Sequence, residues 1–170
     1  QNFDSDDFFV SKSNELAHKV LLNLTKPEKY IYLKGPLKSG KTHLGLLWKR
    51  IHSAIFFNYD DYDQIMSQKK NVFIDNFIYE IDEEKLFYLI NHCYNNNLKI
   101  LITSELSLLD YQFKLNDLLS RLKSFYFVEM LDPDDELIIN ILVKLLYDRQ
   151  IQINSDEIFS TSDESILEFE

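Results

Sequence analysis

Eight consecutive residues, 35–42, carry the clearest chemical signal in the sequence. They read Gly-Pro-Leu-Lys-Ser-Gly-Lys-Thr and match the pattern G-x-x-x-x-G-K-[ST], which is typical of a loop that cradles nucleotide phosphates. Its glycines allow backbone N–H groups to converge on a phosphate, and the following helix adds partial positive charge at its amino end. Lys41 is expected to reach the β- and γ-phosphates, and the Thr42 hydroxyl to ligate Mg²⁺. The other residues of the expected cradle are Gly35, Pro36, Lys38, Ser39 and Gly40.

The alternative is a glycine turn that precedes a helix by chance. Average residue usage makes such a match rare, on the order of one chain of this length in a hundred or fewer. The chain has only 3 glycines, and all of them lie between Gly35 and Gly45. This clustering indicates that the backbone there needs conformations or close approaches that a Cβ would forbid.

A second candidate for chemistry is the acid that ends the apolar run 72–75. The Asp75 carboxylate would lie beside the phosphate loop and hold Mg²⁺ directly or through water, although Asp75 could also simply begin a turn. The next residue is Asn76, where an acid would be the usual group to polarise an attacking water. An amide cannot act as a general base, so hydrolysis by this chain alone is expected to be slow.

Short apolar runs alternate with helical patterns along the chain and must position these residues. The expected strands are 30–33, 54–57, 72–74, 100–102 and 125–128. The expected helices are 15–24, 41–51, 83–95, 116–122 and 134–147. Five apolar strands separated by helices predict an α/β fold with a parallel sheet covered on both faces.

Composition excludes several classes of protein. The chain has 170 residues, of which 45% are hydrophobic, so it can form about one domain with a buried core. No apolar run approaches the length of a membrane span, no secretion signal is visible, and the single cysteine fits a reducing, cytoplasmic setting. The formal net charge of −10 argues against a broad, sequence-independent grip on nucleic acid.

Several segments together resemble the DnaA/Hda family of AAA+ proteins. Residues 8–14 (FFVSKSN) are similar to the first box of that family, and His43-Leu44 extends the phosphate loop into its G-K-T-H-L form. Residues 72–76 resemble the Hda strand that ends in an Asp-Asn pair, and residues 101–105 (LITSE) resemble the sensor 1 strand. Residues 118–122 (LLSRL) are similar to the box that carries the arginine finger.

The resemblance implies an AAA+ core over residues 1–132, with a parallel sheet in the order 5-1-4-3-2. Residues 133–170 would form a partial, truncated helical lid with an acidic tail. ADP or ATP would bind with Mg²⁺ held by Thr42 and Asp75, and adenine would lie against Val10, with His43 close to the loop. Glu105 would hold the sensor 1 position.

The resemblance also assigns a role to Arg121, one of 3 arginines. Arg121 would be an arginine finger that stabilises charge on a neighbouring subunit's nucleotide, although it could instead complement a helix dipole, as expected for Arg50 and Arg149. Ser11 departs from the family in replacing a glycine. No counterpart of the sensor 2 arginine or of the origin-binding helix-turn-helix is found, so no sequence-specific DNA binding is expected.

Three functional hypotheses follow. The first is an Hda-like regulator that promotes ATP hydrolysis by the replication initiator DnaA and so restrains initiation. Such regulators are tethered to the DNA sliding clamp, but no clear clamp motif precedes Phe3. The second is a stand-alone small P-loop ATPase or kinase, and the third is a nucleotide-binding interaction module without turnover. Self-association of the chain is left open.

Overall fold

The computed structural model of the chain describes residues 8–77 and 82–148. Its strands are β1 (Tyr30–Lys34), β2 (Ile55–Phe56), β3 (Val72–Ile74), β4 (Ile100–Ser104) and β5 (Tyr126–Glu129). Its helices are α1 (Glu15–Leu21), α2 (Lys41–Ile51), α3 (Tyr62–Ser67), α4 (Glu83–Asn95), α5 (Asn116–Lys123) and α6 (Asp135–Asp148). Short 3₁₀ turns lie at Tyr59–Asp61 and Leu108–Asp110.

The five strands form one parallel sheet in the order β2-β3-β4-β1-β5. Read from the other side, this is the predicted order 5-1-4-3-2, so the sheet topology is confirmed. The central strand pair, β1 with β4, is in register from Tyr30 opposite Ile100 to Lys34 opposite Ser104. All strands therefore end at one edge of the sheet, which is where the phosphate loop and Asp75 are expected.

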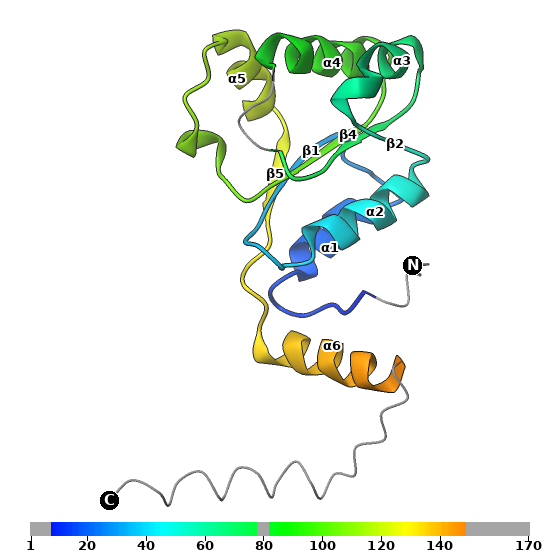
Figure 1. Cartoon of the computed structure of the whole chain (residues 1–170), viewed down its shortest axis with the longest axis vertical. Helices are drawn as coiled ribbons and strands as arrows, with labels where there is room; N and C mark the ends of the chain where they lie inside the picture. The colour runs from blue at the N-terminus through cyan, green and yellow to red at the C-terminus, as the bar shows by residue number, and fades with distance from the viewer. Residues whose placement is uncertain (1–7, 78–81, 149–170) are drawn as a thin grey trace, which may run out of the picture. The chain divides into compact units, whose positions relative to one another are not determined.

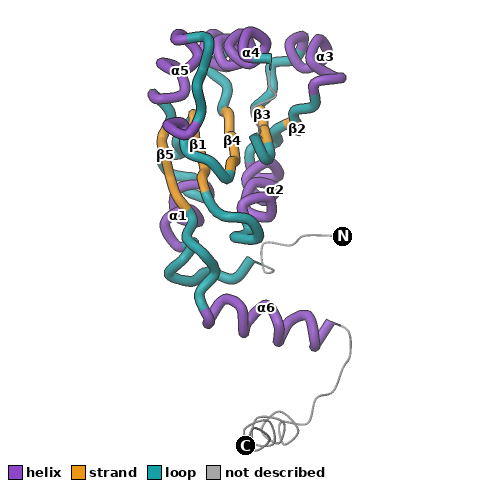
Figure 2. Tube along the Cα trace, turned by 60° about the vertical axis from the view of Figure 1, so that its left-hand side comes forward, coloured by secondary structure: helices purple, strands orange, loops and turns teal. Residues whose placement is uncertain are grey.

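Helices cover both faces of the sheet, as predicted (Figures 1 and 2). Alternate strand residues enter two separate apolar clusters, because successive side chains of a strand point to opposite faces. Tyr32 packs with side chains of α3, α4 and α5, whereas its neighbours Ile31 and Leu33 pack with side chains of α1 and α2. The same alternation places Phe73 in the second cluster, between Val72 and Ile74 in the first.

Gly45 lets α2 approach the sheet closely. A Cβ built on Gly45 would lie 2.2 Å from Cζ and 2.6 Å from Cε2 of the Phe73 ring, and Phe73 is fully buried. Helix α2 can therefore pack directly on β3, the strand that ends next to Asp75, because Gly45 has no side chain.

Replacement of Gly45 by alanine is expected to overpack this contact and lower the free energy of unfolding by about 1–3 kcal/mol. Chemical denaturation measures the change. The double variant Gly45→Ala, Phe73→Leu should recover part of the loss, because the smaller side chain makes room for the methyl group. A Gly45→Ala variant as stable as the wild type would contradict this account of the helix–strand contact.

Some element bounds differ from the predicted ones for local reasons. Helix α1 ends at Leu21 rather than at residue 24, and β2 keeps only two of the four predicted residues. Helix α3 was not predicted, because its six residues include only one buried side chain, Ile65, and so show no apolar stripe. Strand β5 begins at Tyr126, one residue later than predicted.

The chain divides into two compact units, with the boundary between Asp134 and Asp135. The first unit holds the sheet and helices α1–α5, and the second holds α6. None of the helices in the described residues combines the length and the apolar character needed to cross a bilayer. The acidic tail and Arg149 lie outside the described residues.

Candidate nucleotide-binding site

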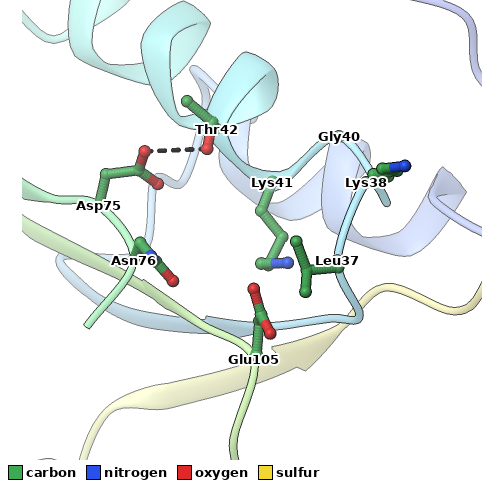
Figure 3. Close-up of a pocket in the computed structure, with 8 residues that line it drawn as sticks. All are labelled: Leu37, Lys38, Gly40, Lys41, Thr42, Asp75, Asn76 and Glu105. Atoms are coloured by element: carbon green, nitrogen blue, oxygen red, sulfur yellow. Dashed lines mark hydrogen bonds between the residues drawn. The ribbon is translucent and has the colours of Figure 1, made fainter. Parts of the chain in front are cut away.

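A hollow of about 380 Å³ lies where β1, β3 and β4 end (Figure 3). Three segments that are far apart in the sequence line it: the phosphate loop, the turn after β3 and the turn after β4. The lining residues are Leu37, Lys38, Gly40, Lys41, Thr42, Asp75, Asn76 and Glu105. The structure thus brings the predicted lysine, threonine and magnesium-binding acid together with the predicted sensor 1 residue.

The loop takes its shape from backbone conformations near its end. Gly40 has a φ of 92° and is the residue that precedes α2. This left-handed conformation strains a residue that carries a Cβ, which accounts for a glycine at this position. The carbonyl of Gly40 accepts a hydrogen bond from the N–H of Leu44 at 3.0 Å, so the loop runs directly into the first turn of the helix.

Ser39 belongs to the loop, and its hydroxyl is buried. The side chain is 3% exposed, and Ser39 Oγ has no hydrogen-bond partner among the described residues. A Cβ on Gly35 would lie 2.9 Å from this oxygen, so the small residue leaves the loop room to close around it. A buried hydroxyl without a partner is costly, and Ser39 is not among the residues that line the hollow.

Lys41 extends through the hollow toward Glu105 (Figure 3). Lys41 is 7% exposed, and its Nζ donates a hydrogen bond to the Pro36 carbonyl at 2.5 Å. Burial lowers the pKa of the Lys41 ammonium, and the carboxylates of Glu105 and Asp75 oppose that shift. A polyanion in the hollow would favour the charged ammonium directly.

Both carboxylate oxygens of Asp75 are held by threonine hydroxyls. Thr42 Oγ1 donates to Oδ2 at 2.8 Å, which links α2 to the end of β3, and Thr103 Oγ1 donates to Oδ1 at 2.6 Å. The Thr103 oxygen also accepts the N–H of Asn76 at 2.9 Å. Thr103 is fully buried within β4. Thr103 was not predicted as a site residue, because a threonine in a strand pattern carries no signal of its own.

We expect Thr103 to fix the direction of the Asp75 carboxylate. Thr103→Val removes the hydroxyl at nearly constant shape and leaves the Asn76 N–H without its acceptor, at a cost of about 1–2 kcal/mol of stability. In ADP titrations of this variant, we expect the increase in affinity on adding Mg²⁺ to be roughly tenfold smaller than in the wild type, equivalent to about 1.4 kcal/mol. Affinity in the absence of Mg²⁺ should not change.

Thr103→Ser provides the matched control, since it keeps the oxygen and removes only a methyl group. It should restore the Mg²⁺-dependent part of the affinity. An equal loss with and without Mg²⁺ in the valine variant would show that Thr103 acts on the fold alone.

The residues that present oxygen toward the phosphate loop fit a magnesium ion. The Thr42 hydroxyl and the Asp75 carboxylate lie within hydrogen-bond distance of each other. Mg²⁺ prefers oxygen ligands and is commonly held by one or two protein groups together with substrate phosphates. The described residues contain no group of three or more histidine, cysteine or acidic side chains placed to hold a metal ion without such help.

Asn76 lies at the mouth of the same hollow. It has a φ of 49°, a left-handed conformation that asparagine tolerates better than most residues, and its side chain is exposed. Figure 3 shows the amide between Asp75 and Glu105. The position that the sequence analysis considered for a general base is therefore in the pocket, but it carries an amide.

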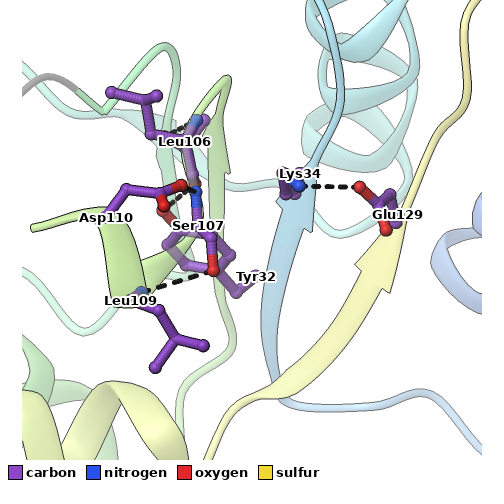
Figure 4. Close-up of polar contacts among 8 residues, drawn as sticks. Tyr32, Lys34, Leu106, Ser107, Leu109, Asp110 and Glu129 are labelled. Carbon is purple, nitrogen blue, oxygen red and sulfur yellow. Dashed lines mark hydrogen bonds and ion pairs between the residues drawn. The ribbon is translucent and has the colours of Figure 1, made fainter.

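Glu105 is, with Asp75, one of two acids in the lining of the pocket, and it follows the last residue of β4. The Tyr32 hydroxyl donates to the Leu106 carbonyl at 3.0 Å, and the Leu106 N–H donates to Ser104 Oγ at 3.1 Å (Figure 4). A capping box between Ser107 and Asp110 then turns the chain away. Two groups of the sheet thus hold Leu106, the residue that follows Glu105.

The structure places five other predicted nucleotide-binding residues outside the lining of the hollow: Gly35, Pro36, Ser39, His43 and Val10. Pro36 contributes its carbonyl to Lys41, and His43 makes an edge contact with the Phe8 ring, whose centroid is 5.5 Å away. Val10 is 46% exposed. The expected contact between adenine and Val10 therefore stays a prediction.

Ser11, which replaces a glycine in the first box, fits its position without strain. Ser11 is not among the described residues that have a positive φ. Its N–H donates to Asn14 Oδ1 at 2.9 Å, and its hydroxyl lies 2.7 Å from Ser13 Oγ. The serine side chain is therefore used in the turn that starts α1.

Arg121 lies far from its own pocket. Its guanidinium carbon is 4.9 Å from the centroid of the Tyr94 ring, and Tyr94 stacks on Tyr30 at 4.0 Å. Tyr30 is the first residue of β1, whereas the phosphate loop follows the last residue of that strand. The two ends of β1 are roughly 13 Å apart at about 3.3 Å per residue. Arg121 is exposed at the opposite edge of the sheet, away from the hollow.

Comparisons with known proteins support the fold. No protein-family model matches the sequence, and no curated protein does. Among solved structures, domain III of the Thermotoga maritima replication initiation protein DnaA superposes with a TM-score of 0.73 at 19% identity, over 91% of this chain and 77% of that one. AMPPCP-bound DnaA from Aquifex aeolicus gives a TM-score of 0.70 at 19% identity, over 89% of this chain. A DnaI crystal structure gives 0.58 at 18% identity, over 76% of this chain and 87% of that one.

The sheet order and these superpositions define the class of fold: the chain has the AAA+ P-loop NTPase fold of DnaA-like proteins. It spans 56% of the length of the Aquifex aeolicus protein. The similarity does not distinguish an Hda-type protein from other members of this fold.

Proposed function

We propose that this chain binds ADP or ATP with Mg²⁺ and acts in DNA replication as an Hda-like regulator of the initiator DnaA. The Aquifex aeolicus structure is described as AMPPCP-bound, and a further DnaA structure with a TM-score of 0.70 and 20% identity as bound to AMPPCP and single-stranded DNA. The orphaned Ser39 hydroxyl, the left-handed Gly40 and the buried Lys41 ammonium support a nucleotide site in the same loop.

One contrast carries the regulatory part of the proposal. The residues for holding a nucleotide converge in the pocket, but an amide, Asn76, stands where a water-activating acid is usual. Arg121, in contrast, is exposed at the far edge of the sheet, out of reach of its own pocket. A chain with a weak site of its own and an available guanidinium suits stimulation of hydrolysis on a partner.

In this proposal each side chain has one task. Lys41 binds the β- and γ-phosphates, and Thr42 and Asp75 would hold Mg²⁺, which neutralises phosphate charge when bound. Thr103 orients Asp75, and Arg121 enters the nucleotide site of an ATP-bound initiator. Stimulated hydrolysis would convert that initiator to its ADP form and so restrain initiation of replication.

The proposal extends to domains, partners and location. Residues 1–132 would be the AAA+ core and residues 133–170 a partial lid with an acidic tail. The sliding clamp is the proposed tether and the cytoplasm the proposed location, and head-to-tail self-association would use the same Arg121 edge. Sequence-specific DNA binding is not part of this proposal.

A stand-alone ATPase is the second candidate, and Glu105 is the observation that favours it. Glu105 is a carboxylate in the lining of the hollow, and Lys41 points toward it. If that carboxylate activates water, the chain hydrolyses ATP without a partner. A nucleotide-binding module without turnover remains the third candidate, favoured by Asn76.

Single-turnover hydrolysis of labelled ATP separates the three functions. The regulatory proposal predicts slow hydrolysis by the chain alone and fast hydrolysis when a catalytic amount is added to ATP-loaded initiator. Comparable rates with and without the initiator would favour the stand-alone ATPase. Tight binding with no hydrolysis in either mixture would favour the module.

A further inference from the structure

Helices α4 and α5 lie side by side on one face of the sheet (Figures 1 and 2). Tyr94 lies in the last turn of α4, and Arg121 lies in the last turn of α5. The Tyr94 ring is half-buried and packs against the first apolar cluster, whereas Arg121 is exposed. A fixed aromatic side chain therefore stands next to the exposed guanidinium to which the proposed function gives its main task.

Tyr94 contacts Arg121 in two ways. The guanidinium carbon lies 4.9 Å from the centroid of the Tyr94 ring, within the range of a cation–π interaction. The Tyr94 hydroxyl lies 2.8 Å from Ser124 Oγ, and Ser124 Oγ donates to the Arg121 carbonyl at 2.6 Å. Because Ser124 uses its proton in that bond, the Tyr94 hydroxyl is the donor to Ser124. Tyr94 thus holds the side chain of Arg121 through its ring and the backbone through its hydroxyl.

The Tyr94 ring is itself supported from behind. Tyr30, the first residue of β1, stacks on it with the centroids 4.0 Å apart and the planes 16° apart. Because Tyr30 covers one face of Tyr94, the guanidinium lies over the other face. On α5, the buried Leu118 and Leu122 fix the rotation of the helix and so the direction in which Arg121 leaves it. The position of the guanidinium is therefore set by the sheet as well as by its own helix.

No carboxylate of the described residues competes for Arg121. The two ion pairs in that part of the chain are Lys19 with Glu15 and Lys34 with Glu129. A carboxylate bound to the guanidinium would have to be displaced before a phosphate could take its place. An aromatic ring offers no acceptor of comparable strength, so it directs the guanidinium and leaves the N–H donors available.

A purely structural role for Tyr94 is the alternative. Its hydroxyl holds Ser124, the residue that follows α5, and that bond alone would serve the fold. The ring contact is not explained in this way, because a cation in the last turn of a helix needs no aromatic partner. Lys123, the other cation of this turn, is not one of the two cations that contact a ring among the described residues. The ring contact is thus specific to Arg121.

We propose that Tyr94 is a positioning residue for Arg121, whose ring holds the guanidinium in the direction in which it enters a partner's nucleotide site. The inference rests on the proposed function, because it takes Arg121 as an arginine finger. An unrestrained arginine loses the freedom of its side-chain torsions when it meets the transition state, and the stack removes part of that cost beforehand. Tyr94 therefore acts on the rate of stimulated hydrolysis and not on nucleotide binding by its own chain.

Single-turnover hydrolysis by ATP-loaded initiator, measured over a range of concentrations of this chain, tests the proposal. Tyr94→Leu removes the ring and keeps an apolar side chain. It should lower the maximal stimulated rate roughly three- to tenfold, which is the effect of leaving one long side chain to be ordered on contact. The concentration that gives half of the maximal rate should not change. Tyr94→Phe keeps the ring and should retain most of the wild-type rate.

Tyr88→Leu is the matched control, since Tyr88 is an exposed tyrosine of the same helix. It should stimulate the initiator as the wild type does. In an Arg121→Ala background, Tyr94→Leu should cause no further loss, because Tyr94 acts through the guanidinium. A further loss in that background, or a Tyr94→Leu variant that changes only the half-maximal concentration, would show that Tyr94 merely shapes the surface and would overturn the proposal.

NMR of the free chain separates this inference from the proposed function. The sequence has 3 arginines, so the Arg121 side-chain resonances can be assigned by comparison with Arg121→Ala. Ring current should shift these resonances upfield in the wild type and in Tyr94→Phe but not in Tyr94→Leu. A wild type without the shift would overturn the positioning role and leave the proposed function standing. A wild type that shows the shift but does not stimulate the initiator would overturn the proposed function, and the positioning role with it.

Discussion

Lys41→Met is expected to abolish thermal stabilisation by ADP and Mg²⁺. A ligand present at about 100 times its Kd stabilises the folded state by about 2.7 kcal/mol, which corresponds to a rise in Tm of roughly 5–10 °C for a chain of this size. Lys41 is the only cation that the structure buries in the candidate nucleotide site within the described residues. Its removal takes away the charge that faces the β- and γ-phosphates.

The variant also separates binding from folding. Methionine keeps the apolar stem, and it removes an ammonium whose pKa burial lowers, so the nucleotide-free protein should be at least as stable as the wild type. Lys85→Met, an exposed lysine outside the hollow, is the control and should retain the full ADP-dependent rise. If ADP raised the Tm of Lys41→Met as much as that of the wild type, the phosphate loop would not be the nucleotide-binding site.

Arg121→Ala is expected to remove the stimulation of an ATP-loaded initiator while leaving ADP affinity unchanged. An arginine finger supplied by a partner contributes about 10³–10⁵ in rate, so the loss should reduce single-turnover hydrolysis to the rate of the initiator alone. The stack of Arg121 on Tyr94 is exposed and contributes only about 0.5–1 kcal/mol, so the variant should fold.

Lys123→Ala tests whether charge alone accounts for the effect. Lys123 is exposed on the same last turn of α5, and its loss changes the net charge by the same amount. It should retain most of the stimulation. If Arg121→Ala instead lowered ADP affinity, Arg121 would have a structural role or act in the nucleotide site of its own chain. Either result would contradict the role inferred from its position at the far edge of the sheet.

The fold was predictable because its signals are local. Each strand is a short apolar run, and the phosphate loop is a contiguous pattern whose chemistry depends on residue types at fixed spacing. Asp75 could be placed beside the loop because parallel strands end at one edge of a sheet. The sheet order itself came from the family resemblance, since apolar runs do not reveal which strands are neighbours.

The remaining features arise only in three dimensions. Thr103 looks like any strand residue until β4 lies beside β3 and its hydroxyl meets the Asp75 carboxylate. The position of Arg121 depends on the stack of Tyr94 on Tyr30, two residues 64 positions apart.

Isothermal titration calorimetry of the purified chain with adenosine polyphosphates and Mg²⁺ tests the central claim most directly. We predict a saturable heat with one nucleotide bound per chain, lost in Lys41→Met and weakened by chelation of Mg²⁺ in the wild type. A wild-type chain that gives no heat with ADP or ATP at millimolar concentration would contradict the account.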